Sequence, residues 1–171
     1  MAEDVTVIND TKTLEAYTKK WSKAKYITID TEFIRERTYW PQLCLIQVGG
    51  PDESVIIDPL AHEINLDCLF SLINSSPVIK VFHAARQDLE LFYHLTGLLP
   101  NPVFDTQIAA SVCGFGDSVG YEKLANKLAG ATIDKTLRFT DWSRRPLSDR
   151  QLRYAISDVL YLRPVYEKLS E

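Results

Sequence analysis

Two carboxylates stand one residue apart at the end of a run of strand-forming residues. The stretch from Tyr26 to Phe33 reads YITIDTEF and contains Asp30 and Glu32. Residues i and i+2 of a strand point to the same face, so these two side chains project side by side. Asp weakens a strand, and two neighbouring carboxylates repel each other unless one takes up a proton. A divalent cation that prefers hard oxygen ligands, Mg²⁺ or Mn²⁺, removes this conflict by binding both. The alternative is a strand that runs out into a solvated turn, and this stretch alone leaves both interpretations open.

The order of strand and helix patterns around this pair predicts an α/β fold. Two apolar runs flank the turn signal GGPDE and predict a β-hairpin. A short, almost fully apolar run at residues 78–82 is typical of a strand in the centre of a sheet. We therefore expect a mixed sheet with an antiparallel hairpin at its edge, parallel strands beside it and helices on its faces. The expected strands are Val5–Ile8, Tyr26–Asp30, Leu43–Gly49, Ser54–Asp58 and Val78–Phe82, and the expected helices are Thr11–Lys23, Asn65–Asn74, one that Gly97 closes, one from Asp105, Tyr121–Ala129 and Ser148–Leu169.

Length and composition indicate one ordinary globular domain. The chain has 171 residues, of which 46% are hydrophobic and 25% charged. A net charge of −4 argues against a protein that coats nucleic acid through a general positive field, but not against a local grip on a short stretch. No apolar run approaches the ~18 residues that span a membrane, and the N-terminus lacks a secretory pattern. The three cysteines are far apart, which fits a reducing compartment. We expect a cytoplasmic protein without a membrane partner; the oligomeric state stays open, with a monomer favoured.

Two further acids lie in expected helices. Asp88 lies about one turn into the helix after the central strand, and α/β sheets bind ligands at such crossings. Its alternative role is favourable charge at a helix N-terminus. Asp158 lies in mid-helix among apolar residues and shares a face with Tyr154, four residues earlier. A buried carboxylate is costly unless it is paired or bound to a metal, so the alternative for Asp158 is a structural Asp bonded to Lys or Arg.

These acids carry a family resemblance. Asp30-x-Glu32, Asp88 and Tyr154-x-x-x-Asp158 resemble, in order and spacing, the three motifs of the DEDD 3′–5′ exonuclease superfamily, in its tyrosine branch. Four longer blocks are similar to the catalytic domain of the bacterial ribonuclease D family: DTEFIRERTYWPQLCLIQ, VFHAARQDLELF, FDTQIAASVCG and TDWSRRPLSDRQLRYAISDVLYL. The resemblance implies a ribonuclease H-like fold. We expect residues 1–171 to form a single 3′–5′ exonuclease domain, without the C-terminal helical nucleic-acid-binding modules that this family usually carries.

The resemblance also implies a chemistry. It implies a 3′–5′ exoribonuclease that hydrolyses phosphodiesters from the 3′ end of RNA, such as tRNA precursors or short RNAs, and releases nucleoside 5′-monophosphates with the help of two divalent cations, Mg²⁺ or Mn²⁺. The implied metal ligands are Asp30, Glu32, Asp88 and Asp158, with Asp30 bridging both cations and Asp88 acting on the second through water. Tyr154 would orient the attacking water, because a phenol pKa near ~10 is too high for easy proton uptake at neutral pH.

Substrate contacts are expected mainly from a basic segment and from aromatic residues. Between residues 135 and 153, six basic residues minus two acids give +4. Aromatic side chains next to the acids could stack on terminal bases, a contact worth ~1–3 kcal/mol each. The alternative for Phe33 and Trp142 is plain core, and Arg145 could simply brace the last helix. The expected substrate-binding residues are Phe33, Gln42, Leu43, His83, Lys135, Trp142 and Arg144.

Three other functions compete with this one. A 3′–5′ exonuclease acting on single-stranded DNA would use the same acids, since RNA differs through its 2′-OH. An inactive nucleic-acid-binding module usually lacks one of the metal acids, whereas this chain has all four and the tyrosine. A carboxylate-metal phosphatase would not need the helix with Tyr154 and Asp158. The expected partner is the 3′ end of single-stranded RNA, with DNA left open.

Overall fold

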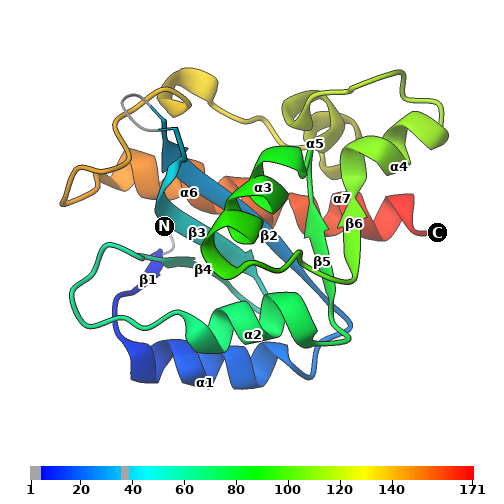
Figure 1. Cartoon of the computed structure of the whole chain (residues 1–171). Helices are drawn as coiled ribbons and strands as arrows, with labels where there is room; N and C mark the ends of the chain where they lie inside the picture. The colour runs from blue at the N-terminus through cyan, green and yellow to red at the C-terminus, as the bar shows by residue number, and fades with distance from the viewer. Residues whose placement is uncertain (1–4, 36–38) are drawn as a thin grey trace.

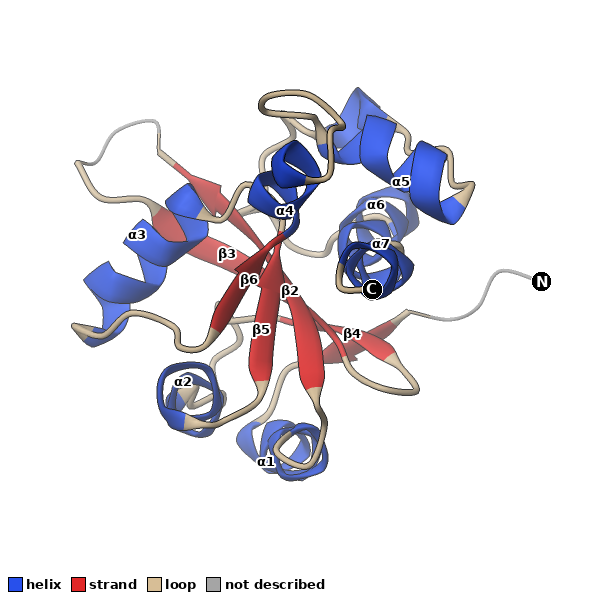
Figure 2. Ribbon diagram, turned by 90° about the vertical axis from the view of Figure 1, so that its right-hand side faces the viewer, coloured by secondary structure: helices blue, strands red, loops and turns tan. Residues whose placement is uncertain are grey.

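One six-stranded sheet forms the centre of the fold, in the order β1-β4-β3-β2-β5-β6. The computed structural model describes residues 5–35 and 39–171. Helices α1, α2 and α3 pack on one face of the sheet, and α6 and α7 cover the other (Figures 1 and 2). The strands are β1 (Thr6–Ile8), β2 (Tyr26–Ile34), β3 (Gln42–Gly49), β4 (Ser54–Ile57), β5 (Ile79–Phe82) and β6 (Val103–Asp105). The helices are α1 (Thr11–Trp21), α2 (Asp67–Ser75), α3 (Arg86–Thr96), α4 (Thr106–Val112), α5 (Tyr121–Ala129), the short 3₁₀-helix η1 (Lys135–Leu137), α6 (Asp149–Leu160) and α7 (Leu162–Leu169).

The topology confirms the expected mixed sheet flanked by helices. Strands β2, β3 and β4 pair in antiparallel fashion, and the other neighbours are parallel. The hairpin lies one strand in from the edge, because β1 pairs alongside β4. The opposite edge is β6, which the sequence analysis did not expect, since three residues are too few to show an alternating pattern. Within the described residues, no helix is both long and apolar enough to cross a membrane.

Strand β2 continues four residues beyond its expected end, which places the acid pair inside the sheet. Asp30 stands opposite Gln47, and Glu32 stands opposite Leu45 on β3. The strand register shifts between Glu32 and Phe33, a β-bulge that kinks the strand directly after the acids. The prediction that the strand ends at Asp30 was therefore wrong, because backbone pairing to β3 outweighs the poor strand propensity of two acids.

The single helix expected over Ser148–Leu169 is in fact two helices. Helix α6 starts at the expected N-cap, where Ser148 and Gln151 form a capping box. It ends at Leu160, and α7 begins two residues later. Pro164 explains the break, because it has no N–H to donate to the Leu160 carbonyl and its ring crowds that carbonyl. As a result α6 packs on β2, β3 and β4, and α7 packs on β2 and β5.

A close approach between α6 and the sheet sets the height of the helix above β2. The Thr28 hydroxyl donates a hydrogen bond of 2.9 Å to the Val159 carbonyl. Gly49 on β3 lies beside this bond, and a Cβ there would come within 2.2 Å of Thr28 Oγ1 and 3.2 Å of the Val159 oxygen. Only a residue without a side chain lets the helix come this near. Asp158, which precedes Val159, is thereby held over the face of β2 that carries Asp30.

We expect Gly49→Ala to lower the free energy of unfolding by about 1–3 kcal/mol, because the new methyl group overpacks the contact between α6 and the sheet. Urea unfolding of the purified protein measures this change. The control is the same substitution in a Thr28→Ala background, where the nearest atom is gone and the cost should shrink. An equal cost in both backgrounds would show that Thr28 does not limit the space.

Candidate active site

Four acids from three elements meet in one cavity. Asp30 and Glu32 come from β2, Asp88 from the first turn of α3 and Asp158 from the last turn of α6. One carboxylate oxygen each from Asp30, Glu32 and Asp158 lies within 4.8 Å of the others. All four acids line a cavity of about 510 Å³. The strand and helix periodicities therefore bring these residues together, as the sequence analysis expected.

Asp88 reaches the cavity from the other side of the sheet. Its helix, α3, packs with α1 and α2, whereas α6 covers the opposite face. Thr31, which lies between the two acids of β2 and points to the α3 side, donates a hydrogen bond of 2.5 Å to Asp88 Oδ1. Asp88 is only 7% exposed, so this bond orients a buried carboxylate. Thr31 is not among the site residues predicted from the sequence, although the alternation along β2 indicates that it faces away from Asp30 and Glu32.

The turn that leads into α3 is held by a single carboxylate. Asp105, at the end of β6, accepts hydrogen bonds from the backbone N–H groups of Ala84 at 3.0 Å and Ala85 at 2.9 Å. It also accepts one of 2.8 Å from Gln107, at the start of α4. Ala84 has a φ of 55°, a left-handed conformation that costs a residue with a Cβ of the order of 1–2 kcal/mol. These bonds offset that strain and fix where α3 begins, and therefore where Asp88 lies.

Burial raises the pKa of Asp30, Glu32, Asp88 and Asp158, and neighbouring carboxylates add to the rise for the first three. Burial, together with the charge of Asp30, raises the pKa of Glu32 to about 10. Burial raises the pKa of Asp158 to about 7, although the charge of Arg138 opposes the shift. The pKa values of Asp30 and Asp88 lie well above their usual range, again chiefly because of burial and then because of a neighbouring carboxylate. The cluster thus carries more negative charge than it can hold without protons or cations.

This donor set fits divalent cations. Its ligand atoms are all carboxylate oxygens, which suit Mg²⁺ and Mn²⁺ rather than softer metals. The three grouped carboxylates are close enough to share an ion, and a bound cation would favour their charged forms, against the burial that raises their pKa values. Asp30, Glu32 and Asp158 are therefore the candidate metal ligands, with Asp88 beside them.

Tyr154 lines the same cavity, one helical turn before Asp158. Burial, followed by the charge of Asp158, raises the pKa of its hydroxyl. The phenol therefore keeps its proton and acts as a hydrogen-bond donor or acceptor. Its ring stacks on the indole of Trp142 at 5.9 Å between centroids with an interplanar angle of 29°. Trp142 is 2% exposed, so it buttresses Tyr154 from behind.

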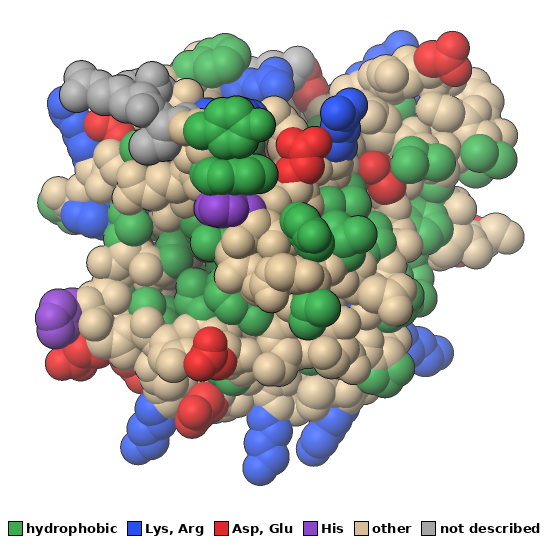
Figure 3. All heavy atoms as spheres, viewed as in Figure 1, with side chains coloured by type: hydrophobic (Ala, Val, Ile, Leu, Met, Phe, Trp, Pro, Cys, Tyr) green, Lys and Arg blue, Asp and Glu red, His purple; other side chains and the backbone are tan. Residues whose placement is uncertain are grey.

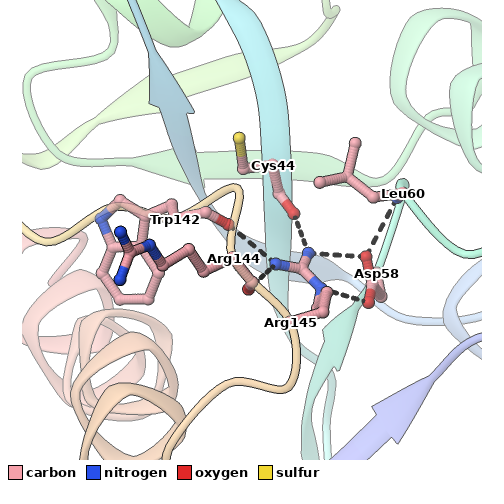
Figure 4. A network of polar contacts seen from close by, with 6 residues as sticks. All are labelled: Cys44, Asp58, Leu60, Trp142, Arg144 and Arg145. Atoms are coloured by element: carbon pink, nitrogen blue, oxygen red, sulfur yellow. Dashed lines mark hydrogen bonds and ion pairs between the residues drawn. The ribbon is translucent and has the colours of Figure 1, made fainter.

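An arginine clamp ties the segment that carries Trp142 to the sheet (Figure 4). Arg145 donates from Nε and Nη2 to the two carboxylate oxygens of Asp58, each at 2.7 Å. It also donates to the Cys44 carbonyl at 2.9 Å and to the Trp142 carbonyl at 2.8 Å. A bidentate Arg–carboxylate pair fixes geometry as well as charge. Arg145 thus has the bracing role that the sequence left open, but it braces the segment before α6 against β3 and β4.

The expected substrate-binding residues divide into three groups. Phe33 and His83 line the cavity with the acids, and burial lowers the pKa of His83, which keeps its ring neutral. Trp142 and Leu43 lie in hydrophobic core clusters, which for Trp142 is the alternative that the sequence left open. The others lie elsewhere: Gln42 is exposed at the start of β3, Arg144 is exposed and pairs with Asp141 at 3.3 Å, and Lys135 begins η1 with its side chain outside the described residues.

The cavity also has lining residues that the sequence analysis did not choose. Phe139 is 93% exposed and lines the cavity, and Arg138 lies 5.5 Å from its ring centroid. Tyr121 lies against His83 at 5.5 Å and donates a hydrogen bond of 2.9 Å to the Ser157 carbonyl. Arg138 and Phe139 belong to the basic segment that was noted from the sequence. Nothing in their spacing, however, distinguished them from Arg144 and Trp142.

Comparison with known families gives one match over almost the whole chain. Residues 5–171 match the family described as 3′-5′ exonuclease. Curated relatives named Ribonuclease D include one from Bartonella henselae, 54% identical over 160 residues, which cover 94% of this chain and 39% of the relative. Another, from Jannaschia sp., is 56% identical over 167 residues, which cover 95% of this chain and 43% of the relative. This chain therefore spans about two fifths of the length of these relatives.

Solved structures agree in fold. The crystal structure of Escherichia coli RNase D, described as an exoribonuclease involved in structured RNA processing, superposes with a TM-score of 0.92 at 38% identity, covering 98% of this chain and 44% of that one. Brucella melitensis NrnC with bound Mg²⁺ superposes with a TM-score of 0.79 at 29% identity, covering 97% of this chain and 81% of that one. Both likenesses extend over nearly all of this chain.

We expect the melting temperature of the metal-free protein to fall as the pH rises from about 5 to 7. A carboxyl whose pKa is raised by folding binds more protons in the folded state than in the unfolded state. Its contribution to stability is therefore complete below about pH 4 and is lost as the pH rises through the pKa of the folded state. For Asp158 this window runs from its usual 3.8 to about 7. Mg²⁺ or Mn²⁺ should restore the melting temperature at pH 7 by binding only the folded state.

Differential scanning calorimetry in EDTA, and then with each cation, measures both effects. Asp158→Asn is the matched control: it removes the titrating group, so its curve should be flatter between pH 5 and 7 and should respond less to the cations. A wild-type melting temperature that rises over this range would contradict the electrostatic description of the cavity.

Proposed function

Because the chain belongs to the 3′–5′ exonuclease family, we propose that it removes nucleotides one at a time from the 3′ end of RNA and releases nucleoside 5′-monophosphates. The observation that carries this proposal is the cavity in which three carboxylates lie within 4.8 Å of one another beside Tyr154. The names of the relatives support RNA as the substrate, since they include ribonucleases D and an exoribonuclease that processes structured RNA.

We infer that Asp30, Glu32, Asp88 and Asp158 hold two divalent cations, Mg²⁺ or Mn²⁺. When bound, such cations act as Lewis acids on the scissile phosphate and make the attacking water more acidic. The presence of Mg²⁺ in the structure of NrnC supports this choice of ion. The chain's own part is to keep four carboxylates in place against their repulsion, so that little rearrangement is needed when cations and substrate arrive.

Tyr154 has a separate task. Its hydroxyl keeps its proton, because burial and Asp158 raise its pKa. It therefore orients the water that attacks the phosphorus and does not take a proton from it. The ring stack with Trp142 limits the freedom of the phenol, and the clamp around Arg145 holds Trp142 in turn. Positioning of this kind accounts for a large share of the rate enhancement of many enzymes.

The terminal nucleotide is held by the walls of the cavity. Arg138, whose charge opposes the rise in the pKa values of Glu32 and Asp158, supplies positive charge for the phosphate. Phe33 and Phe139 lie on the wall and the rim of the cavity, where an aromatic ring can stack on a base of any sequence. Phe139 thus takes the role that the sequence analysis gave to Trp142.

The direct test is digestion of short single strands labelled at the 3′ or at the 5′ end. We expect the 3′ label to appear first as a mononucleotide and the 5′ label to shorten stepwise, in Mg²⁺ or Mn²⁺ but not in EDTA. RNA should be degraded in preference to DNA, and a 3′-phosphate should block the reaction. Asp30→Asn should abolish activity while the fold is retained. Internal cuts in a circular RNA, or activity of the Asp30 variant within tenfold of wild type, would contradict the proposal.

We expect Tyr154→Phe to slow the chemical step by on the order of 10²-fold while KM changes little, because the lost hydrogen bond acts mainly in the transition state. Single-turnover cleavage of a 3′-labelled RNA measures this step. Tyr166→Phe is the matched control, since Tyr166 packs against Tyr26 and Phe104 and does not itself line the cavity. If the Tyr154→Phe variant cleaved RNA at the wild-type rate, Tyr154 would have only a packing role.

A further inference from the structure

An aromatic stack stands on the surface beside the acidic cavity. Tyr39 and Trp40 lie in the connection between β2 and β3 and are 78% and 49% exposed. The Trp40 ring lies over the imidazole of His94 on α3, with 4.3 Å between centroids and only 10° between planes. Tyr39 meets Trp40 edge-on at 5.1 Å. Figure 3 shows hydrophobic rings lying over a histidine on this face of the molecule.

This stack adjoins the acidic cavity. A small hollow of about 30 Å³ is lined by Phe33, Arg35, Trp40, Pro41, Gln87 and Glu90. Phe33 and Gln87 also line the acidic cavity, so the two spaces share a wall. Phe33 directly follows Glu32 in the chain, at the β-bulge. A single-stranded nucleic acid that leaves the acidic cavity over Phe33 would therefore next reach Trp40.

Packing alone does not account for these rings. The other two tryptophans, Trp21 and Trp142, are almost completely buried. Large aromatic side chains that stay exposed and cluster on the surface are typical of interaction sites. Basic groups accompany the stack: Arg35, directly after β2, and Arg86, at the start of α3, are exposed, although Arg86 pairs with Glu90 at 3.1 Å. Flat aromatic faces beside cationic groups suit unpaired bases on a phosphate backbone.

We propose that Tyr39 and Trp40, supported by His94, form a stacking site for the bases that lie upstream of the scissile phosphate. This inference rests on the proposed function and adds to it the direction in which the substrate leaves the cavity. The terminal nucleotide occupies the acidic cavity, the backbone passes Phe33 and Arg35, and the next unpaired bases stack on the exposed rings. Such a site takes any base, because every base has a π-face. It also requires a single strand, because paired bases present no free face to it.

The length of the substrate provides the test. In wild type, kcat/KM should be higher for an eight-nucleotide RNA than for a dinucleotide, since only the longer strand reaches the stack. Trp40→Ala and Tyr39→Ala should each lower kcat/KM for the octanucleotide by roughly 5- to 20-fold through KM, the size expected for the loss of one base stack. Both variants should cleave the dinucleotide like wild type. Trp40→Phe, which keeps a flat ring, should restore most of the loss.

Tyr93→Ala is the matched control. Tyr93 is the exposed aromatic residue that precedes His94 on α3, but it lines a separate, largely apolar cavity with Leu99 and Ile108. Its loss should leave both substrates unaffected. An equal loss on dinucleotide and octanucleotide in the Trp40 and Tyr39 variants, or no loss on either, would overturn the stacking site. So would a Tyr93 variant that loses as much as the Trp40 variant.

A binding measurement separates this inference from the proposed function. Trp40 is the exposed tryptophan of the chain, and its emission should be quenched by an oligouridylate octamer in EDTA, where no cleavage occurs. Trp40→Phe should remove the quenching. If wild type cleaves neither RNA yet is quenched, the proposed function fails and the stacking site stands. If it cleaves both RNAs and is not quenched, the stacking site fails and the proposed function stands.

Discussion

The repulsion among buried carboxylates is the constraint on which this structure depends. Asp30, Glu32 and Asp158 present oxygens within 4.8 Å of one another, and each acid has a raised pKa because of burial first of all. Left alone, such a cluster would move apart or take up protons. The fold holds it together through β2, which is paired to β3 on one side and β5 on the other, and through α6, which is bonded to β2 by Thr28.

The supports approach from both faces of the sheet. On one face, α6 brings Asp158 and Tyr154, and the ring of Trp142 lies behind Tyr154. On the other face, α3 brings Asp88, which Thr31 orients, and Asp105 fixes the turn before α3. The two acids of β2 therefore meet one partner from each layer of the molecule. Thr31 and Trp142 are uncharged, whereas the Asp105 carboxylate adds to the rise in the pKa of Asp88.

The acids and their convergence could be predicted from the sequence because the direction of each side chain follows from the repeat of the strand or helix that carries it. Asp30 and Glu32 follow the two-residue period of a strand, and Tyr154 and Asp158 follow a helical turn. Sequence alone did not predict how far β2 extends, because that depends on pairing with β3. Pro164 could have indicated the end of α6, but the apolar pattern continued past it. Trp142 is buried and Phe139 is exposed because of the way an irregular segment packs. Such a segment has no regular repeat from which the direction of a side chain could be predicted.

The contact between Thr28 and Gly49 also limits how related chains can diverge. The two residues lie on neighbouring strands, and an added Cβ at position 49 would meet the hydroxyl of residue 28 at 2.2 Å. Residues in such contact contribute to stability in a non-additive way. The order of substitutions in a lineage therefore matters: a smaller residue at position 28 opens the way for a side chain at position 49, whereas the reverse order passes through an overpacked intermediate. Position 49 is thus constrained by the residue at position 28 as well as by the backbone of α6, although Gly49 does not line the acidic cavity.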